Sequence, residues 1–248
     1  MHNYFECHNY NPNSTISLFC FPHAGGGADI YYDWSNFIRP EINIYILNLP
    51  GRGKKYLEKP FEEFNVLLDN LLIDIEDLLD KPFIIFGHSM GALIGFELSR
   101  RIFEMYNKKP EHLYVSSYPS PEIINNNLVE NNISDDELIT KLKELNGTPK
   151  EIFQHKRFLK LLLPVIRADF KLLNSYSYKE LAPLSCPITS IIGSHDNISV
   201  ELAKEWYKHS VAVFSLQIFR GDHFYLNNFE AKKKIGKLIE KDFMKINN

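Results

Sequence analysis

The stretch FGHSMG, residues 86–91, decides the fold because it places a serine between two glycines directly after the apolar residues 83–85. A strand, the pattern Gly-x-Ser-x-Gly and a helix together form a nucleophile elbow, a sharp turn that exposes the serine at the carboxyl edge of a sheet. Gly87 and Gly91 fit such a turn, since a Cβ at either position would crowd neighbouring backbone. The N–H groups at the start of the helix expected over residues 90–105 would face Ser89 and stabilise negative charge there. We therefore predict that Ser89 is a nucleophile in an α/β fold.

Apolar runs of strand length alternate with amphipathic stretches of helix length along most of the chain. This alternation is typical of a mainly parallel sheet covered by helices. The expected strands are residues 16–21, 44–49, 83–86, 113–116, 189–192 and 216–219, and the expected covering helices are 64–79, 90–105 and 231–243. A chain of 248 residues is long enough for one domain of this class, so we predict a single domain over residues 1–248.

Residues 119–178 interrupt the alternation, because they carry no strand signal. Ser134 and Glu137 form a Ser-x-x-Glu capping box, which predicts the start of a helix through residue 145, and a second helix is expected over 158–173. A helical segment of about 60 residues between two strands can act as a lid over a site, or it can be an extra covering layer with no moving part. We predict a helical lid insertion over residues 119–178.

The composition disfavours several classes of function. A formal net charge of −3 gives no global basic surface that would attract nucleic acid or anionic lipid. Residues 1–14 are polar and lack the features of a signal peptide, and no apolar run approaches the length of about 20 residues that spans a bilayer. Cys7, Cys20 and Cys186 are too few and too scattered for a disulfide framework or a zinc site. We therefore expect a cytoplasmic monomer that binds neither nucleic acid nor membranes and holds no metal.

A reactive serine needs a base, and the base needs an orienting acid. Asp196 follows the expected strand 189–192, and His223 follows the expected strand 216–219. The order Ser, Asp, His is that of α/β-hydrolases, and the carboxyl ends of strands are where such sheets place active sites. We predict that Asp196 is the acid and His223 the base, with Asp222 as the competitor for the acid because it adjoins His223. His88 and His195 adjoin motif residues, and we expect them to support the site rather than to catalyse.

The loop CFPHAGGGA, residues 20–28, follows the first expected strand and can supply a second donor for an oxyanion. Its three glycines allow close approach of the backbone, so that the N–H of Ala24 can pair with the N–H of Met90 around a carbonyl oxygen. Phosphate binding is the alternative for a glycine-rich loop before a helix. The chain has no Gly-x-Gly-x-x-Gly followed by an acid at the usual distance and no Gly-Lys-Ser/Thr, which disfavours a nucleotide site.

These motifs resemble the type II thioesterases, discrete hydrolases that accompany nonribosomal peptide and polyketide synthases and are related to the medium-chain thioesterase of animal fatty acid synthesis. The resemblance covers nearly the whole chain, and its most specific part lies in the inserted helices. The segments that carry it are FCFPHAGGGA (19–28), LPGRG (49–53), FGHSMGALIGFEL (86–98), SDDELITKLKELNGTPKEIF (134–153), LLLPVIRADFKLLNSY (161–176), CPITSIIGSHD (186–196) and GDHFYL (221–226). Two departures, a less acidic GSHDN around Asp196 and an aspartate at 222 where glycine is more frequent, bear on local loop geometry only.

The resemblance implies an α/β-hydrolase that removes acyl groups from the phosphopantetheine arm of carrier proteins and so clears mis-primed or stalled units, without a cofactor. Residue by residue, it implies that Ser89 is the nucleophile, Asp196 the orienting acid and His223 the general base, with Ala24 and Met90 as oxyanion donors. A carboxylesterase or lipase acting on oxygen esters is the alternative enzyme. A binding protein with an inactive hydrolase fold is the alternative outside enzymes.

A carrier partner raises a question of charge, because the resemblance implies that carrier domains are acidic around their attachment serine. The net charge of the chain is −3, so attraction would need a local basic patch. Two clusters are candidates for that patch, and the alternative for both is an ordinary solvated surface. The clusters are Arg52, Lys54 and Lys55, and Lys150, Lys156, Arg157 and Lys160.

Overall fold

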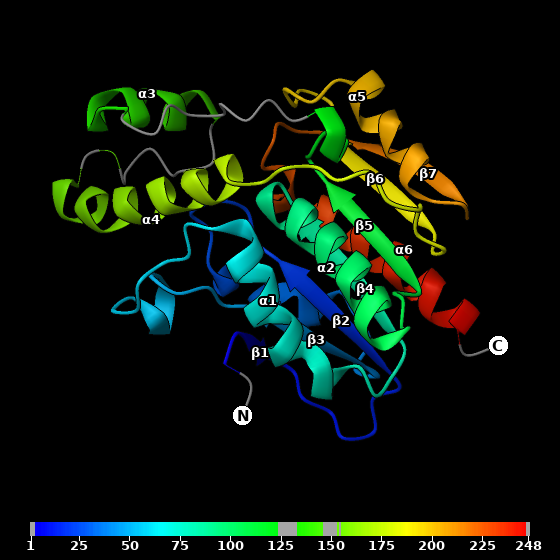
Figure 1. Cartoon of the computed structure of the whole chain (residues 1–248). Coiled ribbons are helices and arrows are strands. Elements are labelled where there is room, and N and C mark those ends of the chain that lie inside the picture. Colours follow the sequence, from blue (N-terminus) through cyan, green and yellow to red (C-terminus); the bar gives the residue numbers. More distant parts are fainter. Residues whose placement is uncertain (1–2, 124–132, 146–152, 154, 247–248) are drawn as a thin grey trace.

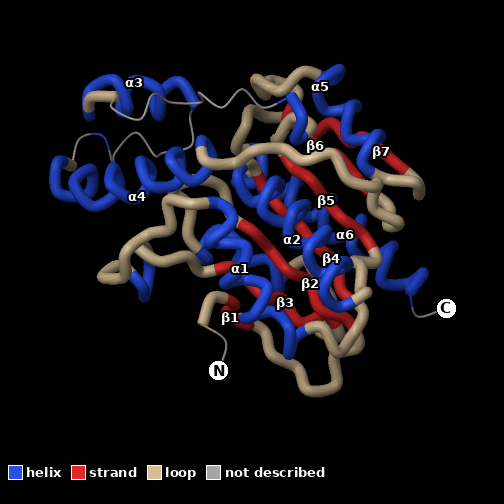
Figure 2. Tube along the Cα trace, in the orientation of Figure 1, coloured by secondary structure: helices blue, strands red, loops and turns tan. Residues whose placement is uncertain are grey.

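A seven-stranded sheet runs through the protein, in the order β1-β3-β2-β4-β5-β6-β7 (Figures 1 and 2). The structure is a computed structural model that describes residues 3–123, 133–145, 153 and 155–246. The strands are β1 (Phe5–Cys7), β2 (Ile16–Phe21), β3 (Ile42–Leu47), β4 (Phe83–His88), β5 (His112–Ser116), β6 (Ile188–Gly193) and β7 (Phe214–Phe219). All neighbouring pairs are parallel except β1 with β3. The predicted parallel sheet is therefore confirmed, with one short antiparallel edge strand that the sequence pattern did not reveal.

Both faces of the sheet are buried, which explains why its central strands read as continuous apolar runs. Along β2, Ile16, Leu18 and Cys20 point into one core. Phe19 and Phe21 point into the core on the opposite face. Successive side chains of a strand alternate between faces, so one strand contributes to two separate cores.

Helices cover the two faces as the alternation predicted (Figure 1). Helices α1 (Phe64–Ile75) and α2 (Met90–Tyr106) pack on the core that contains Phe19. Helix α6 (Phe229–Ile246) packs on the other face, beside a 3₁₀ helix over Ala28–Asn36. The chain also forms a short helix α5 (Val200–Lys204) after β6. The 3₁₀ helix and α5 were not predicted, because neither is long enough to give a clear helical period.

Two helices, α3 (Asp135–Leu145) and α4 (Lys156–Asn174), lie between β5 and β6 in the chain. The predicted capping box is present, since Ser134 N–H donates to Glu137 and Glu137 N–H donates to Ser134 Oγ. The two helices share an apolar cluster formed by Leu138, Leu142, Leu159, Leu163 and Ile166. They lie beyond the arrowhead ends of β2 and β5 in Figure 1. Residues 124–132 and most of 146–154 fall outside the described residues, and the action of segment 119–178 as a lid stays a prediction.

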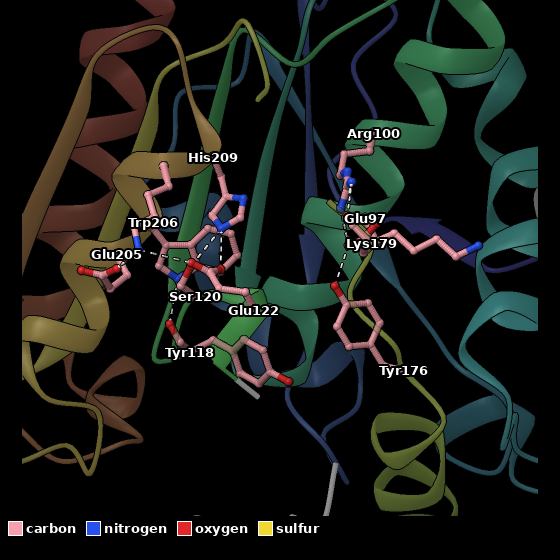
Figure 3. A network of polar contacts seen from close by, with 11 residues as sticks. Glu97, Arg100, Tyr118, Ser120, Glu122, Tyr176, Lys179, Glu205, Trp206 and His209 are labelled. Atoms are coloured by element: carbon pink, nitrogen blue, oxygen red, sulfur yellow. Dashed lines mark hydrogen bonds and ion pairs between the residues drawn. The ribbon is translucent and has the colours of Figure 1, made fainter. Parts of the chain in front are cut away.

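Polar contacts fix the chain to the core at both ends of this segment (Figure 3). On the entry side, Trp206 Nε1 donates to the carbonyl of Tyr118, and His209 Nε2 lies 2.7 Å from Glu122 Oε2. On the exit side, the Tyr176 hydroxyl donates to Glu97. Arg100 Nη2 donates to the carbonyl of Lys179 at 2.6 Å. The ends of the segment are thus held to the body of the molecule by hydrogen bonds as well as by packing.

Within the described ranges, every helix is either too short or too polar to traverse a lipid bilayer.

Candidate active site

Ser89 occupies a sharp turn between β4 and α2. Its backbone has φ of 53° and ψ of −122°, a conformation that non-glycine residues rarely adopt. A Cβ on Gly87 would clash with the carbonyl oxygen of Gly91, and one on Gly91 would clash with that of Phe21. Ser89 N–H donates to the carbonyl of Ser116 at 2.7 Å, which ties the turn to the end of β5. The predicted elbow is therefore present, and its two glycines are required by close backbone contacts.

The structure brings the three predicted triad residues together at the carboxyl ends of the strands. Ser89 Oγ lies 3.0 Å from His223 Nε2. His223 Nδ1 lies 3.0 Å from Asp196 Oδ1. Asp196 follows β6 and His223 follows β7, and backbone hydrogen bonds join the two loops, from Ser194 N–H to Phe219 and from His195 N–H to Gly221. Nucleophile, base and acid are thus within hydrogen-bond reach in one chain of contacts.

The carboxylate of Asp196 is fully buried and receives several hydrogen bonds. Ser117 Oγ donates to Oδ2 at 2.6 Å, and Ile198 N–H donates to Oδ1 at 3.3 Å. Burial by itself raises the pKa of Asp196, but hydrogen bonds from His223 and Ser117 outweigh it and hold the pKa below its usual value. Asp196 therefore stays ionised at neutral pH and can orient the imidazole of His223.

The competitor Asp222 contacts a backbone group, whereas the imidazole of His223 contacts Asp196. Its Oδ1 accepts a hydrogen bond from the backbone N–H of Phe224, as the side chain of a turn residue does. His195 is also outside the contact chain, since its side chain is exposed and its Nδ1 lies 3.0 Å from Ser194 Oγ.

The loop that contains Ala24 and the start of α2, which contains Met90, are in close backbone contact. Gly91, the second residue of α2, packs against the carbonyls of Phe21 and Pro22, which begin the loop that contains Ala24. Among the described residues, neither the Ala24 N–H nor the Met90 N–H donates a hydrogen bond. Both donors are therefore free for an oxygen that carries negative charge, as the oxyanion prediction requires.

Two further histidines lie beside His223. The ring of His88 is 5.4 Å from that of His223, and the ring of His23 packs against Phe224. Burial, followed by the charges of His223 and Arg52, lowers the pKa of His23 to about 3. Burial and the charges of His223 and His23 likewise lower the pKa of His88 well below its usual value. Both of these imidazoles are therefore neutral at physiological pH.

Sequence reasoning missed Ser117 and the placement of His23. Ser117 follows the expected strand 113–116 directly, so the strand-end argument that found Asp196 and His223 also applied to it. His23 precedes Ala24 in the glycine-rich loop and gave no signal beyond that position. Position after a strand could therefore have indicated Ser117, whereas His23 is recognisable only from what it contacts.

The prediction that Arg52 forms a basic surface patch with Lys54 and Lys55 is wrong, because Arg52 is buried. This side chain is 8% exposed and forms an ion pair with Asp169 of α4 at 2.6 Å. Lys54 pairs with Glu6, and Lys55 with Glu58. Arg52 is buried because a carboxylate from the inserted helices covers it, a contact that the sequence alone could not reveal. In the second cluster, Lys150 and the side chain of Lys156 lie outside the described residues, while Arg157 and Lys160 are exposed.

Metal ligands are not grouped in the described ranges, where no set of three or more His, Cys, Asp or Glu side chains could hold an ion.

Comparison with known proteins identifies the family of this chain. The model of the thioesterase domain matches residues 16–243. The chain belongs to the thioesterase family. This thioesterase is 38% identical to the gramicidin S biosynthesis protein GrsT of Aneurinibacillus migulanus, over 90% of this chain and 87% of the relative. It is 32% identical to the human medium-chain S-acyl fatty acid synthase thioesterase, over 96% of this chain and 91% of the relative.

Solved structures agree with this assignment. The type II thioesterase BorB of the borrelidin biosynthetic cluster superimposes on this thioesterase with a TM-score of 0.87 and 32% identity, covering 96% of this chain and 97% of BorB. The resemblance to type II thioesterases and the α/β-hydrolase fold that it implied are therefore confirmed. The enzyme is a hydrolase of this group, and the alternative of an inactive binding protein has no support.

Proposed function

We propose that this thioesterase hydrolyses acyl groups from the phosphopantetheine arm of carrier proteins, and that it clears mis-primed or stalled units in nonribosomal peptide or polyketide synthesis. The relatives GrsT and BorB are named for gramicidin S and borrelidin biosynthesis. The single observation that carries the chemistry is the contact chain from Ser89 through His223 to Asp196. We also propose a monomeric, cytoplasmic enzyme.

The acylation step follows from this geometry. The Ser89 hydroxyl gives its proton to His223 Nε2 as its oxygen bonds to the thioester carbonyl carbon. The Ala24 and Met90 N–H groups receive the negative charge that develops on the carbonyl oxygen. The C–S bond then breaks, and the proton on His223 passes to the departing thiol. Asp196 stabilises the positive charge that His223 carries between these two transfers.

Deacylation repeats the same proton transfers with water in place of serine. A water molecule gives a proton to His223 Nε2 as its oxygen attacks the acyl-Ser89 carbonyl. The bond to Ser89 Oγ then breaks, the proton returns to that oxygen, and the free acid leaves. No residue beyond those already named is required, and phosphopantetheine belongs to the substrate.

The substrate proposal is tested by hydrolysis of a panel of acyl-loaded carrier proteins, with Ser89→Ala as the control. We expect Ser89→Ala to lower the turnover rate by roughly 10⁴-fold or more, because the variant has no nucleophile that could form the acyl intermediate. Thermal unfolding should stay close to that of the wild type, since the hydroxyl contributes little packing. Activity of the variant within tenfold of the wild type would contradict the role of Ser89.

Matched oxygen esters and thioesters with the same acyl chain distinguish the alternative enzyme. A carboxylesterase or lipase would prefer the oxygen ester, whereas the proposed function predicts a preference for the thioester. Preference for the oxygen ester would replace the proposal by the esterase alternative.

A further inference from the structure

Asp169 is a buried carboxylate that the triad does not use. It lies on α4, is 1% exposed, and comes from the inserted segment rather than from the sheet. A buried charge is expensive unless other groups satisfy it, so its partners indicate what it holds in place.

The partners of Asp169 belong to the loop that carries Ala24. Gly25 N–H donates to Asp169 Oδ2 at 2.6 Å. Arg52 donates from Nη1 to Oδ2 at 2.8 Å and from Nη2 to Oδ1 at 2.6 Å. Arg52 Nη1 also donates to the carbonyl of Gly26 at 3.1 Å. The pair therefore holds the N–H of Gly25 and the carbonyl of Gly26, directly after Ala24.

Apolar contact adds to these hydrogen bonds. Gly25 has φ of +75°, and a Cβ at this position would lie 2.7 Å from Ile166 Cγ1 of α4. Ile166 and Asp169 are three residues apart, so they lie on the same face of the helix. That face of α4 rests directly on the glycine-rich loop.

Fixing Gly25 restricts the orientation of the Ala24 N–H. Each peptide unit is planar, so only the two dihedrals of Ala24 separate its own N–H from the N–H of Gly25. If the Asp169 carboxylate no longer accepts from Gly25 N–H, the peptide unit between Ala24 and Gly25 is free to rotate. The direction of the Ala24 N–H is then no longer fixed. An oxyanion donor acts through its preorganised position, so such a loss lowers the rate of the chemical step rather than substrate binding.

The ion pair is not needed simply to hold α4 on the protein. Leu172 and Leu173 of α4 lie in the same core as α1 and α2. Buried ion pairs contribute little net stability, because desolvation of both charges offsets their attraction. An apolar contact of the same size could give similar stability. It could not orient the peptide groups of the glycine-rich loop, as the ion pair does.

We propose that Asp169, together with Arg52, is a positioning residue for the oxyanion hole, so that acylation of Ser89 requires α4 to be seated on the glycine-rich loop. This inference rests on the proposed acyl-serine chemistry. It assigns to the inserted segment a part in building the active site, in addition to any part in covering it.

Two double variants separate positioning from stability. Arg52→Met with Asp169→Asn and Arg52→Met with Asp169→Leu both remove the charged pair, so neither leaves an unpaired buried charge. The asparagine would keep an oxygen that can accept from Gly25 N–H, while the leucine would not. The probe is an alkyl fluorophosphonate, which phosphonylates a serine nucleophile with loss of fluoride. In the transition state of this reaction, negative charge develops on the phosphoryl oxygen, which would lie in the oxyanion hole.

The second-order rate of Ser89 labelling is measured for both double variants, together with kcat and KM for a small acyl thioester and the Tm. We expect the leucine variant to be labelled at least about tenfold more slowly than the asparagine variant, a part of the 10²–10³-fold that loss of a whole oxyanion donor costs. Its kcat should fall by a similar factor, with KM of the two variants within about twofold of each other.

Equal labelling rates in the two variants would overturn the inference, and so would a loss of kcat that merely follows a loss of Tm. If the leucine variant does not fold, Asp169→Glu replaces it, because this variant keeps the charge but displaces the carboxylate by one methylene. We then expect about a tenfold lower kcat at unchanged KM, and wild-type kcat would overturn the inference. Absence of Ser89 labelling in the wild type would instead contradict the proposed function.

Discussion

At the residue scale, Asp196, the proposed acid of the triad, is held from both sides. Ser117 and His223 contact opposite oxygens of Asp196. Ser117 has φ of 50°, so the chain adopts an unfavourable backbone conformation where its hydroxyl meets the carboxylate. Asp196 therefore has one orientation, and that orientation sets the direction of the His223 ring.

Replacing each aspartate by asparagine tests which one orients His223. We expect Asp196→Asn to lower kcat by about 10³–10⁴-fold, because an amide can stabilise the wrong tautomer of the imidazole and does not stabilise its charged form. Asp222→Asn should cost less than about threefold, since its side chain accepts from the backbone N–H of Phe224, and the amide oxygen of asparagine can accept the same hydrogen bond. Hydrolysis of one small thioester by both variants at the same pH provides the comparison. The reverse ranking would transfer the acid role to Asp222.

At the scale of elements, α6 is joined to the sheet by a buried carboxylate at the edge opposite the active site. Asp242 lies 2.8 Å from His112 Nδ1 of β5 and accepts from Lys245 at 2.7 Å and from the hydroxyl of Tyr114. Burial by itself raises the pKa of Asp242, but the hydrogen bonds from His112, Lys245 and Tyr114 outweigh it and hold the pKa well below its usual range.

This depressed pKa predicts a loss of stability in acid. The unfolded chain binds a proton at Asp242 near pH 4, where the folded protein does not, so the stabilisation is present above about pH 4 and is lost as the pH falls further. Between pH 5 and pH 3, we expect the unfolding free energy of the wild type to fall by on the order of 1–2 kcal/mol more than that of Asp242→Asn. Urea unfolding at both pH values measures the difference. The exposed Asp77→Asn serves as the matched control and should behave like the wild type; equal acid sensitivity of Asp242→Asn would show that this carboxylate contributes nothing.

At the scale of the whole molecule, charge bears on how a carrier protein would dock. The net charge is −3, and Arg52 is buried in an ion pair with Asp169, so it offers no positive charge at the surface. Arg157 and Lys160 remain exposed on α4, whose N-terminal end projects to the left of the sheet in Figure 1. An acidic carrier that approaches this end of α4 would meet the positive charges of these two side chains.

Charge reversal at these positions tests that approach. We expect Arg157→Glu with Lys160→Glu to raise KM for an acyl-carrier substrate by about three- to tenfold at low salt, and by less at high salt. Hydrolysis of a small acyl thioester should be little affected, because neither side chain belongs to the contact chain of Ser89, His223 and Asp196. The control is Lys233→Glu with Lys237→Glu on α6, which changes the net charge equally on two exposed lysines of another helix. An equal rise in KM for both pairs would mean that net charge, and not this end of α4, governs docking.

The amino-acid sequence by itself determined the elements that have a strong local signal. The elbow around Ser89 was predictable because backbone crowding permits only glycine at 87 and 91, whatever the rest of the chain does. Asp196 and His223 were predictable because parallel strands bring their carboxyl ends to one edge of the sheet, so position after a strand is enough to place a side chain. The capping box at Ser134 is likewise a local interaction of four residues.

The tertiary structure alone decided which distant residues meet. Arg52 read as one of three clustered surface charges, and it became buried because Asp169, 117 positions further along, is brought against it. Ser117 and Asp196, 79 positions apart, meet for the same kind of reason. Such contacts leave no periodic pattern, since each depends on how helices and strands pack rather than on local spacing. The sequence therefore determined the proposed reacting groups, and packing decided which residues hold those groups in position.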